Sequence, residues 1–318
     1  MQTTGLSDRW TGRTLWRQVR KRWQLYLFLV LPLAWLITFC YVPMVGVQIA
    51  FKNFLPRDGI WGSEWIAFKH FETFFHAYNF KQIIWNTFRI SIYSLVVGFP
   101  LTIVFALMIN LIVNSKFKKF TQTVSYMPHF ISTVVMVGIL FQVLNPVTGV
   151  YGNVYRIFHP GQYPVNILSR GEAFDHLYVW SGVWQGLGWG TIIYLAALSS
   201  VDPELHEAAQ LDGASRLKRV WYIDLPVLLP TASIMLIMSA GGVLSVGFEK
   251  VYLMQNSMNA DYSEVISTYV YKVGLGGLMN QMSYSAAIGL LNNIVNALML
   301  LIVNFITSKL SGGQNSLF

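Results

Sequence analysis

Long uncharged apolar runs, separated by short charged segments, are the dominant pattern along the chain. A helix needs roughly 20 mostly apolar residues to cross the hydrocarbon core of a bilayer, so each run of that length predicts one membrane span. The predicted spans are Leu25–Phe51, Ile90–Ser115, Thr121–Tyr155 with its end trimmed by Asn145-Pro146, Leu177–Val201, Leu225–Phe248 and, within the uncharged stretch Val273–Ser308, about Ala286–Thr307. The pattern therefore predicts an all-α polytopic membrane protein with six transmembrane helices.

The composition supports this prediction and narrows the chemistry. Of the 318 residues, 54% are hydrophobic and 11% are charged, whereas soluble domains carry about 25% charged residues. The one cysteine, Cys40, lies in the first predicted span, and the six histidines show no spacing typical of a zinc site. We therefore expect neither a soluble fold, nor a disulfide framework, nor a metal site.

Positive charge is distributed unevenly between the two sets of connecting segments. An even number of spans puts both termini on one side, and that side carries 13 Lys and Arg residues against 8 on the other. Cytoplasmic segments carry the excess of Lys and Arg, so both termini of this multi-pass protein are predicted to be cytosolic. The pI near 9.5 then follows from topology and from contact with anionic membrane lipid, and no nucleic-acid partner is expected.

This topology divides the chain into five predicted segments. They are a basic cytosolic N-terminal segment (1–23), a first transmembrane helix (24–51), an extracytoplasmic loop (52–81), a transmembrane core of five helices (82–309) and a cytosolic tail (310–318). The core includes a cytosolic loop, residues 200–226, between the fourth and fifth spans.

That cytosolic loop holds the densest cluster of charge in the chain. Asp202 is a good N-cap and Pro203 suits a first helical position, so a short helix is predicted over about 203–211. Gly213 can adopt the left-handed conformation that ends such a helix. Ser215 or Asp212 can then cap a second short helix.

The second helix is predicted to run to about Tyr222 and to be stopped by Pro226. The loop thus forms a helix-turn-helix elbow at the membrane face. A plain solvated loop is the simpler interpretation. Against it, two adjacent alanines and a glycine leave a surface that another protein can approach closely, and Glu207 and Asp212 offer carboxylates to a partner's Arg or Lys.

The string Glu207-Ala-Ala-Gln-Leu-Asp-Gly-Ala214, followed by Ile223-Asp-Leu-Pro226, resembles the EAA loop of bacterial ATP-binding cassette (ABC) importer permeases with the type I, MetI-like transmembrane fold. In that family the loop forms a coupling helix that sits in a cleft of the nucleotide-binding subunit. The resemblance implies residence in the bacterial inner membrane. It assigns ATPase coupling to Glu207, Ala208, Ala209, Asp212, Gly213 and Ala214.

Four further segments resemble a narrower group, the LplB-type permease subunits. They are Tyr41–Phe51, Ser125–Ser132, Thr191–Ala197 and Gly247–Tyr252. That group imports oligosaccharides derived from complex polysaccharides, including rhamnogalacturonan (pectin) and alginate. The resemblance implies transport by ATP-driven alternating access. It also implies a second homologous permease subunit, two copies of an ATPase subunit and an extracytoplasmic solute-binding protein as partners.

The chain lacks the phosphate-binding string Gly-x-x-x-x-Gly-Lys-Ser/Thr. We therefore expect no cofactor and no enzymatic site in this chain, with ATP and Mg bound by the partner ATPase subunits. Gly186-Leu-Gly-Trp-Gly190 is better explained by close helix packing. Two alternatives stay open, an ABC permease for a solute other than a sugar and an ion-coupled secondary transporter, although the latter calls for acidic residues inside the spans.

Polar and aromatic residues within the spans are candidates for the substrate path, because sugars are bound by amide hydrogen bonds and aromatic stacking. The candidates are Trp184, Gln185, Trp189 and Tyr194 in the fourth span and Asn292, Asn293 and Asn296 in the sixth. Helix–helix hydrogen bonding is the alternative role for the amides. At the outer end of the fifth span, Glu249, Lys250 and Tyr252 are placed where a binding protein docks or a gate closes, with Glu249 and Tyr252 as the leading candidates.

Overall fold

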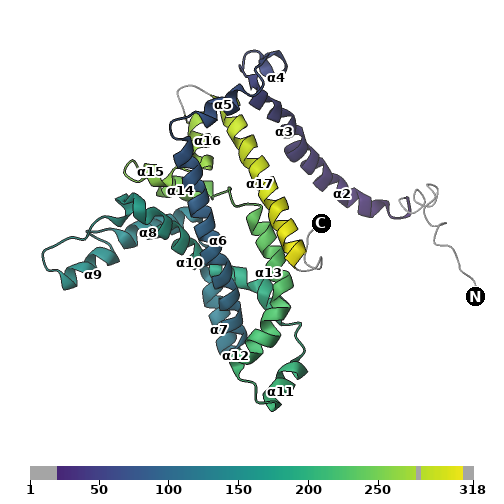
Figure 1. The fold of residues 1–318 in the computed structure, drawn as a ribbon, viewed down its shortest axis with the longest axis vertical. Coiled ribbons are helices and arrows are strands. Elements are labelled where there is room, and N and C mark those ends of the chain that lie inside the picture. The colour runs from purple at the N-terminus through teal and green to yellow at the C-terminus, as the bar shows by residue number, and fades with distance from the viewer. Residues whose placement is uncertain (1–19, 277–280, 311–318) are drawn as a thin grey trace, which may run out of the picture. The chain divides into compact units, whose positions relative to one another are not determined.

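The computed structural model describes residues 20–276 and 281–310 of the chain. The chain divides into two compact units, Met1–Ala67 and Phe68–Phe318. Both are built mainly from helices (Figure 1).

The first unit contains one long apolar helix and a small hairpin. The helix, Trp23–Phe51, joins α2 (Trp23–Leu36), a π-helical segment (Ile37–Tyr41), α3 (Val42–Met44) and a 3-10 segment (Val45–Phe51). Its most apolar part has a mean hydropathy of 2.2 and no buried residue, so its surface suits lipid or another chain. Strands β1 (Lys52–Asn53) and β2 (Glu64–Trp65) pair antiparallel, Lys52 opposite Trp65, and enclose α4 (Gly59–Gly62).

The second unit holds the remaining helices. They are α5 (Lys69–Phe75), α6 (Phe80–Asn110), α7 (Ser115–Tyr126), α8 (Thr133–Leu144), α9 (Val150–Phe158), α10 (Phe174–Leu198), α11 (Pro203–Leu211), α12 (Arg216–Arg219), α13 (Leu225–Ala240), α14 (Phe248–Met254), α15 (Ala260–Ser263), α16 (Ile266–Gly274) and α17 (Met282–Leu310).

The centre of this unit is formed by α6, α10 and α13. Tyr194 and Leu198 of α10 pack with Ala106 of α6 and with Leu228 and Ala232 of α13, and all five are buried. α17 packs along α13 on its other side (Figure 1). Two further apolar clusters join α6 to α8, α10 and α14 and to α5, α16 and α17. Many large apolar side chains on the outer faces of these helices are exposed.

By length and composition, four helices of the described chain are suited to cross a membrane. They are Trp23–Phe51, Phe80–Asn110, Arg216–Ala240 and Met282–Lys309, and the bent pair Ser115–Phe130 and Thr133–Leu144 makes a fifth if it counts as one span. α10 is long enough to span at 25 residues, but its Trp, Gly and Gln185 residues make it less apolar than these helices. The all-α membrane fold is confirmed, and α10 corresponds to the fourth of the six predicted spans.

The third predicted span is not one straight helix. Its two helical parts meet at 98°, because Met127–Phe130 forms a 3-10 turn with Pro128 at its start and Ile131 is extended. Ser132 then caps α8, its Oγ accepting a hydrogen bond from the Val135 amide at 3.3 Å. A proline next to a good N-cap ends one helix and starts another.

The fifth predicted span is wrong at both ends. Its helix begins at Arg216 and ends at Ala240, so Pro226 does not stop the preceding helix. A π-helical segment, Val220–Asp224, carries the chain into α13 instead, and such wider turns accommodate groups that interrupt the regular hydrogen bonding.

The second span also starts earlier than predicted, at Phe80 rather than Ile90. This places Arg89 well inside α6 and not at a helix end. Its Nε lies 2.5 Å from Asp175 Oδ2 on α10, and pairing with a carboxylate compensates a partly buried charge.

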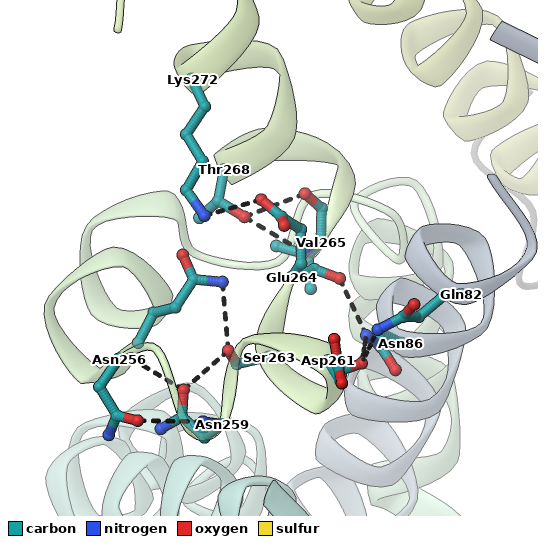
Figure 2. A network of polar contacts seen from close by, with 11 residues as sticks. Gln82, Asn86, Asn256, Asn259, Asp261, Ser263, Glu264, Val265, Thr268 and Lys272 are labelled. Carbon is teal, nitrogen blue, oxygen red and sulfur yellow. Dashed lines mark hydrogen bonds and ion pairs between the residues drawn. The ribbon is translucent and has the colours of Figure 1, made fainter. Parts of the chain in front are cut away.

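The connection between α13 and α17 is folded and anchored by polar contacts (Figure 2). Asn86 Nδ2 of α6 donates to the carbonyl oxygens of Asp261 and Glu264 at 2.9 and 3.1 Å. Lys272 Nζ lies 2.8 Å from Glu264 Oε1, and Ser263 Oγ donates to Asn259 Oδ1 at 3.0 Å. α15 and the start of α16 are thereby held against the beginning of α6, while α14 packs on α8 and α16.

Candidate functional site

The elbow between α10 and α13 begins with α11, as the sequence predicts. Asp202 is the N-cap, its carboxylate accepting a hydrogen bond from the Glu204 amide at 3.0 Å, and Pro203 is the first helical residue. Glu204 lies in the first turn, where a carboxylate is stabilised by the helix dipole.

The end of α11 is defined by a Schellman motif. The Ala214 amide donates to the Ala209 carbonyl oxygen at 2.8 Å, and the Gly213 amide donates to that of Gln210 at 3.1 Å. Gly213 has φ +76°, which favours glycine because other residues are strained there. Ser215 then caps α12. The predicted elbow is therefore confirmed in shape.

A buried contact ties α11 to the base of α13. His206 Nε2 of α11 lies 3.3 Å from Asp224 Oδ1, and the Asp224 side chain is 2% exposed. Arg219 Nη1 also donates to Gln210 Oε1 at 3.5 Å. Together with the unbroken helix from Arg216 to Ala240, these contacts couple the position of α11 to that of α13.

We expect His206→Ala and Asp224→Ala to weaken this same contact. Because either change leaves the other group without its partner, each should destabilise the elbow by about 1–3 kcal/mol. The double variant should cost little more than the larger single change. Limited proteolysis of the elbow in membranes measures these costs, and fully additive costs would show that the two side chains do not interact.

The outer surface of the elbow is small and carboxylate-bearing. Glu207, Ala208, Asp212 and Gly213 are exposed, while Ala209 and Ala214 are half-buried. Glu207 also lines a groove of about 650 Å³ that runs between the elbow and the ends of α6 and α10. This surface can accept a basic partner surface at close range.

Two cavities lie between α6, α10 and the segment that follows α13. Their volumes are about 380 and 390 Å³, and they share Ser94, Gly98, Thr102 and Tyr178. Met235 and Ser239 of α13 line the first. Within the described chain, the buried hydroxyls of Ser91 and Ser94 have no hydrogen-bond partner. A polar ligand could satisfy them.

Lys250 of α14 places a buried ammonium group at the second cavity. The residue is 9% exposed. Its Nζ donates to the Tyr178 carbonyl oxygen at 2.6 Å and lies 4.5 Å from the centre of the Tyr178 ring. Burial lowers the pKa of Lys250 to about 8, because the charged form loses hydration.

Residues 98–312, which contain the elbow and much of both cavities, match the family described as "Binding-protein-dependent transport system inner membrane component". The chain belongs to this family. The predicted family and its type I, MetI-like importer fold are thus confirmed, and the chain is a permease subunit of the bacterial inner membrane.

Named relatives of the permease cover nearly its whole length. It is 38% identical to Protein LplB of Bacillus subtilis (strain 168), over 94% of this chain and 92% of that protein. It is 40% identical to the polygalacturonan/rhamnogalacturonan transport system permease protein YteP of the same organism, over 90% and 88%. A crystal structure of a bacterial alginate ABC transporter, in complex with an alginate pentasaccharide-bound periplasmic protein, contains a chain with TM-score 0.85 and 35% identity, covering 95% and 99%.

The structure brings two of the predicted fourth-span residues to the cavities. Tyr194 lines the first cavity and Gln185 the second. Gln185 Nε2 also donates to the Ile131 carbonyl oxygen at 2.7 Å, which supports the bend between α7 and α8. Neither Trp184 nor Trp189 is among the described residues that line these cavities; Trp189 stacks on His129 with ring centres 4.4 Å apart.

The sixth-span asparagines do not line these cavities. Asn296 Oδ1 accepts from the Leu244 amide at 2.9 Å, and its Nδ2 donates to Ser245 Oγ at 3.0 Å. Asn296 thus binds the non-helical segment that follows α13 and makes no hydrogen bond to another helix through these two contacts. Asn293 is exposed, and the buried Asn292 Oδ1 has no partner within the described chain.

The two leading candidates beyond α13 lie together on α14 but not in the cavities. Glu249 is exposed. Tyr252 packs with Phe248 and Tyr271 at ring-centre distances of 5.4 and 5.3 Å. Their neighbour Lys250 is the α14 residue that reaches a cavity.

Sequence reasoning missed the small polar face of α6. Ser91, Ser94, Gly98 and Thr102 follow one another at spacings of three and four, which puts them on one side of a helix. That spacing was a usable signal. The sequence contains no such signal for the burial of Lys250, because that burial depends on α14 folding back against α10.

Proposed function

We propose that this permease is one of two homologous membrane subunits of an ABC importer for oligosaccharides. Its partners would be the second permease subunit, two ATPase subunits that bind ATP and Mg, and an extracytoplasmic binding protein. The absence of a phosphate-binding string from the sequence supports placing ATP hydrolysis in the partner subunits.

One observation carries the coupling role. The elbow continues through α12 and the π-helical segment into α13 without a break, and Met235 and Ser239 of α13 line the first cavity. A displacement of the elbow would therefore move a cavity wall. Alternating access needs such an element with two arrangements, biased by a partner that binds one of them better.

The carbohydrate substrate is supported by the relatives and by the cavity chemistry. YteP is named for polygalacturonan and rhamnogalacturonan, and the similar solved structure belongs to an alginate importer. Unpartnered serine hydroxyls beside Tyr178 and Tyr194 suit a hydroxylated ligand.

The predicted orientation is supported by how the basic segments lie. Arg216 and Arg219 line the elbow groove together with Asn110 and Val113, at the end of α6 that leads into Lys116, Lys118 and Lys119. Both basic clusters thus occupy one end of the helical unit, which we assign to the cytosol with both termini.

The coupling role is tested by removing one carboxylate. Glu207→Gln and Glu207→Lys should reduce saccharide-stimulated ATP hydrolysis by the reconstituted complex, by roughly tenfold and to background respectively, since a charge-assisted contact to the ATPase is lost or reversed. Glu204→Gln is the matched control, because it removes the same charge one turn earlier on α11. Full stimulation in both Glu207 variants would contradict the docking role.

A further inference from the structure

The ammonium group of Lys250 is buried without a carboxylate. Its contacts within the described chain are one hydrogen bond to the Tyr178 carbonyl oxygen, at 2.6 Å, and the Tyr178 ring. An ammonium group has three N–H donors, so part of its capacity is unused. A buried charge is costly unless it is compensated by an opposite charge.

The group lies open to the second cavity. The neighbouring position on α10 is Gly182, where even a Cβ atom would stand 3.1 Å from Lys250 Nζ. Glycine therefore leaves the approach to the ammonium uncovered. Among the described residues that line the two cavities, Lys250 is the only Lys or Arg and there is no Asp or Glu.

Two hydroxyl side chains line the same cavity as this single charge. Ser94 and Thr102 line both cavities. The Ser94 hydroxyl is buried and has no hydrogen-bond partner within the described chain. A ligand that carries both hydroxyls and a carboxylate would match these groups, because charge-assisted hydrogen bonds to a carboxylate are the strongest available to an ammonium.

We infer that Lys250 is an anion-binding residue of the translocation cavity and contacts the carboxylate of a uronic acid unit in an acidic oligosaccharide. This inference rests on the proposed function and specifies its substrate class. A single cation binds a carboxylate without holding it irreversibly, and a transport site must also release what it binds.

A purely structural role is the competing explanation, in which Lys250 only joins α14 to α10 through Tyr178. Three variants separate the two roles. Lys250→Gln keeps an N–H donor for the Tyr178 carbonyl oxygen but removes the charge, Lys250→Arg keeps the charge, and Lys250→Met removes both. A structural clamp predicts loss in the methionine variant alone, whereas an anion site predicts loss in both uncharged variants.

The experiment measures uptake by proteoliposomes that contain the whole importer with its binding protein. The probes are tetragalacturonate and tetramannuronate, each with its carboxyl-reduced neutral counterpart. We expect Lys250→Gln to lower uptake of an acidic probe by roughly tenfold, with the yield of the assembled complex unchanged. Lys250→Arg should retain most of the uptake, and any uptake of a neutral probe should be equal in all variants.

Three results would overturn the inference. Undiminished acidic uptake by Lys250→Gln shows that the charge is not used. An equal loss for acidic and neutral probes shows a structural role. Wild-type uptake of neutral probes alone shows that the carboxylate is not recognised, while leaving an oligosaccharide importer in place. Uptake of no probe by the wild type contradicts the proposed function itself.

The pH profile offers a readout that a structural role would not move. Since burial places the pKa of Lys250 near 8, below its usual value, the ammonium is charged below pH 8 and neutral above it. Acidic uptake should fall as pH rises through about 8 in the wild type, and this fall should be absent in Lys250→Arg, whose guanidinium stays charged. An unchanged fall in the arginine variant would assign the titration elsewhere.

Few other titratable groups lie around Lys250. On α10 they are Tyr178, in direct contact, Asp175, one turn earlier and paired with Arg89, and His176, whose Nδ1 lies 2.8 Å from the Tyr93 hydroxyl of α6. α8 carries no ionisable residue, α14 itself adds the exposed Glu249 and Tyr252, and α16 carries Tyr269, Tyr271 and Lys272, the last paired with Glu264.

Discussion

Gly213→Pro is expected to reduce saccharide-stimulated ATP hydrolysis to background while the permease still inserts into the membrane. Proline fixes φ near −65° and has no amide hydrogen, whereas Gly213 has φ +76° and donates to the Gln210 carbonyl oxygen at 3.1 Å. The Schellman motif cannot form, so α11 and α12 lose their fixed angle, at a cost of about 3 kcal/mol or more. ATP hydrolysis by the reconstituted importer measures the effect.

A second left-handed glycine gives the matched control. Gly161, after α9, has φ +79°, and a Cβ atom added there would have no neighbouring atom within 4 Å. Gly161→Pro imposes the same backbone conflict away from the elbow and should leave coupling largely intact. Equal losses in both variants would show that general misfolding, and not elbow geometry, causes the defect.

Gly188→Ala is expected to lower the yield and thermal stability of the folded permease sharply. A Cβ atom at this position would stand 2.1 Å from the Ser125 carbonyl oxygen and 2.4 Å from its carbon. Because the obstruction is backbone, α10 and α7 must move apart, and such overpacking costs about 1–3 kcal/mol or more. Thermal unfolding of the detergent-solubilised permease, followed by size-exclusion chromatography, measures this cost.

Gly186 is the matched control for this change. It lies on the same helix with no atom within 4 Å of an added Cβ, and alanine has a better helix propensity than glycine by about 1 kcal/mol. Gly186→Ala should therefore be neutral or stabilising. A stable Gly188→Ala permease would mean that α10 and α7 do not pack as closely as the structure indicates.

Both predictions concern glycines that the sequence singles out, and the structure distinguishes their roles. Gly188 and Gly190 lie against Ser125 and Thr102, as close helix packing predicts, whereas Gly186 has open space. Gly213 serves a turn and not a packing contact. Residue type alone does not separate these roles, because each depends on what lies beside the backbone.

The elbow and the first cavity are connected by one helix. α13 continues from the elbow and lines the cavity, and the His206–Asp224 contact holds α11 to its base. Lys250 lies on α14, beyond the break that ends α13.

The sequence by itself determined the membrane class, most of the spans and the shape of the elbow. Hydropathy is a local property of about 20 residues, and the groups that define α11, Asp202, Pro203 and Gly213, act within one or two turns of the backbone they stabilise. The family resemblance on Glu207–Ala214 is local in the same sense.

Only the tertiary structure decided which polar groups face the cavities and where the long helices bend or end. Lys250 contacts Tyr178, which is 72 positions away in the sequence, and Arg89 contacts Asp175, which is 86 positions away. No local pattern encodes such contacts, because the cost of burying a charge is set by whatever the fold brings beside it. Asn296 of α17 is a further example. Its side-chain oxygen accepts a hydrogen bond from the backbone amide of Leu244, just beyond the end of α13.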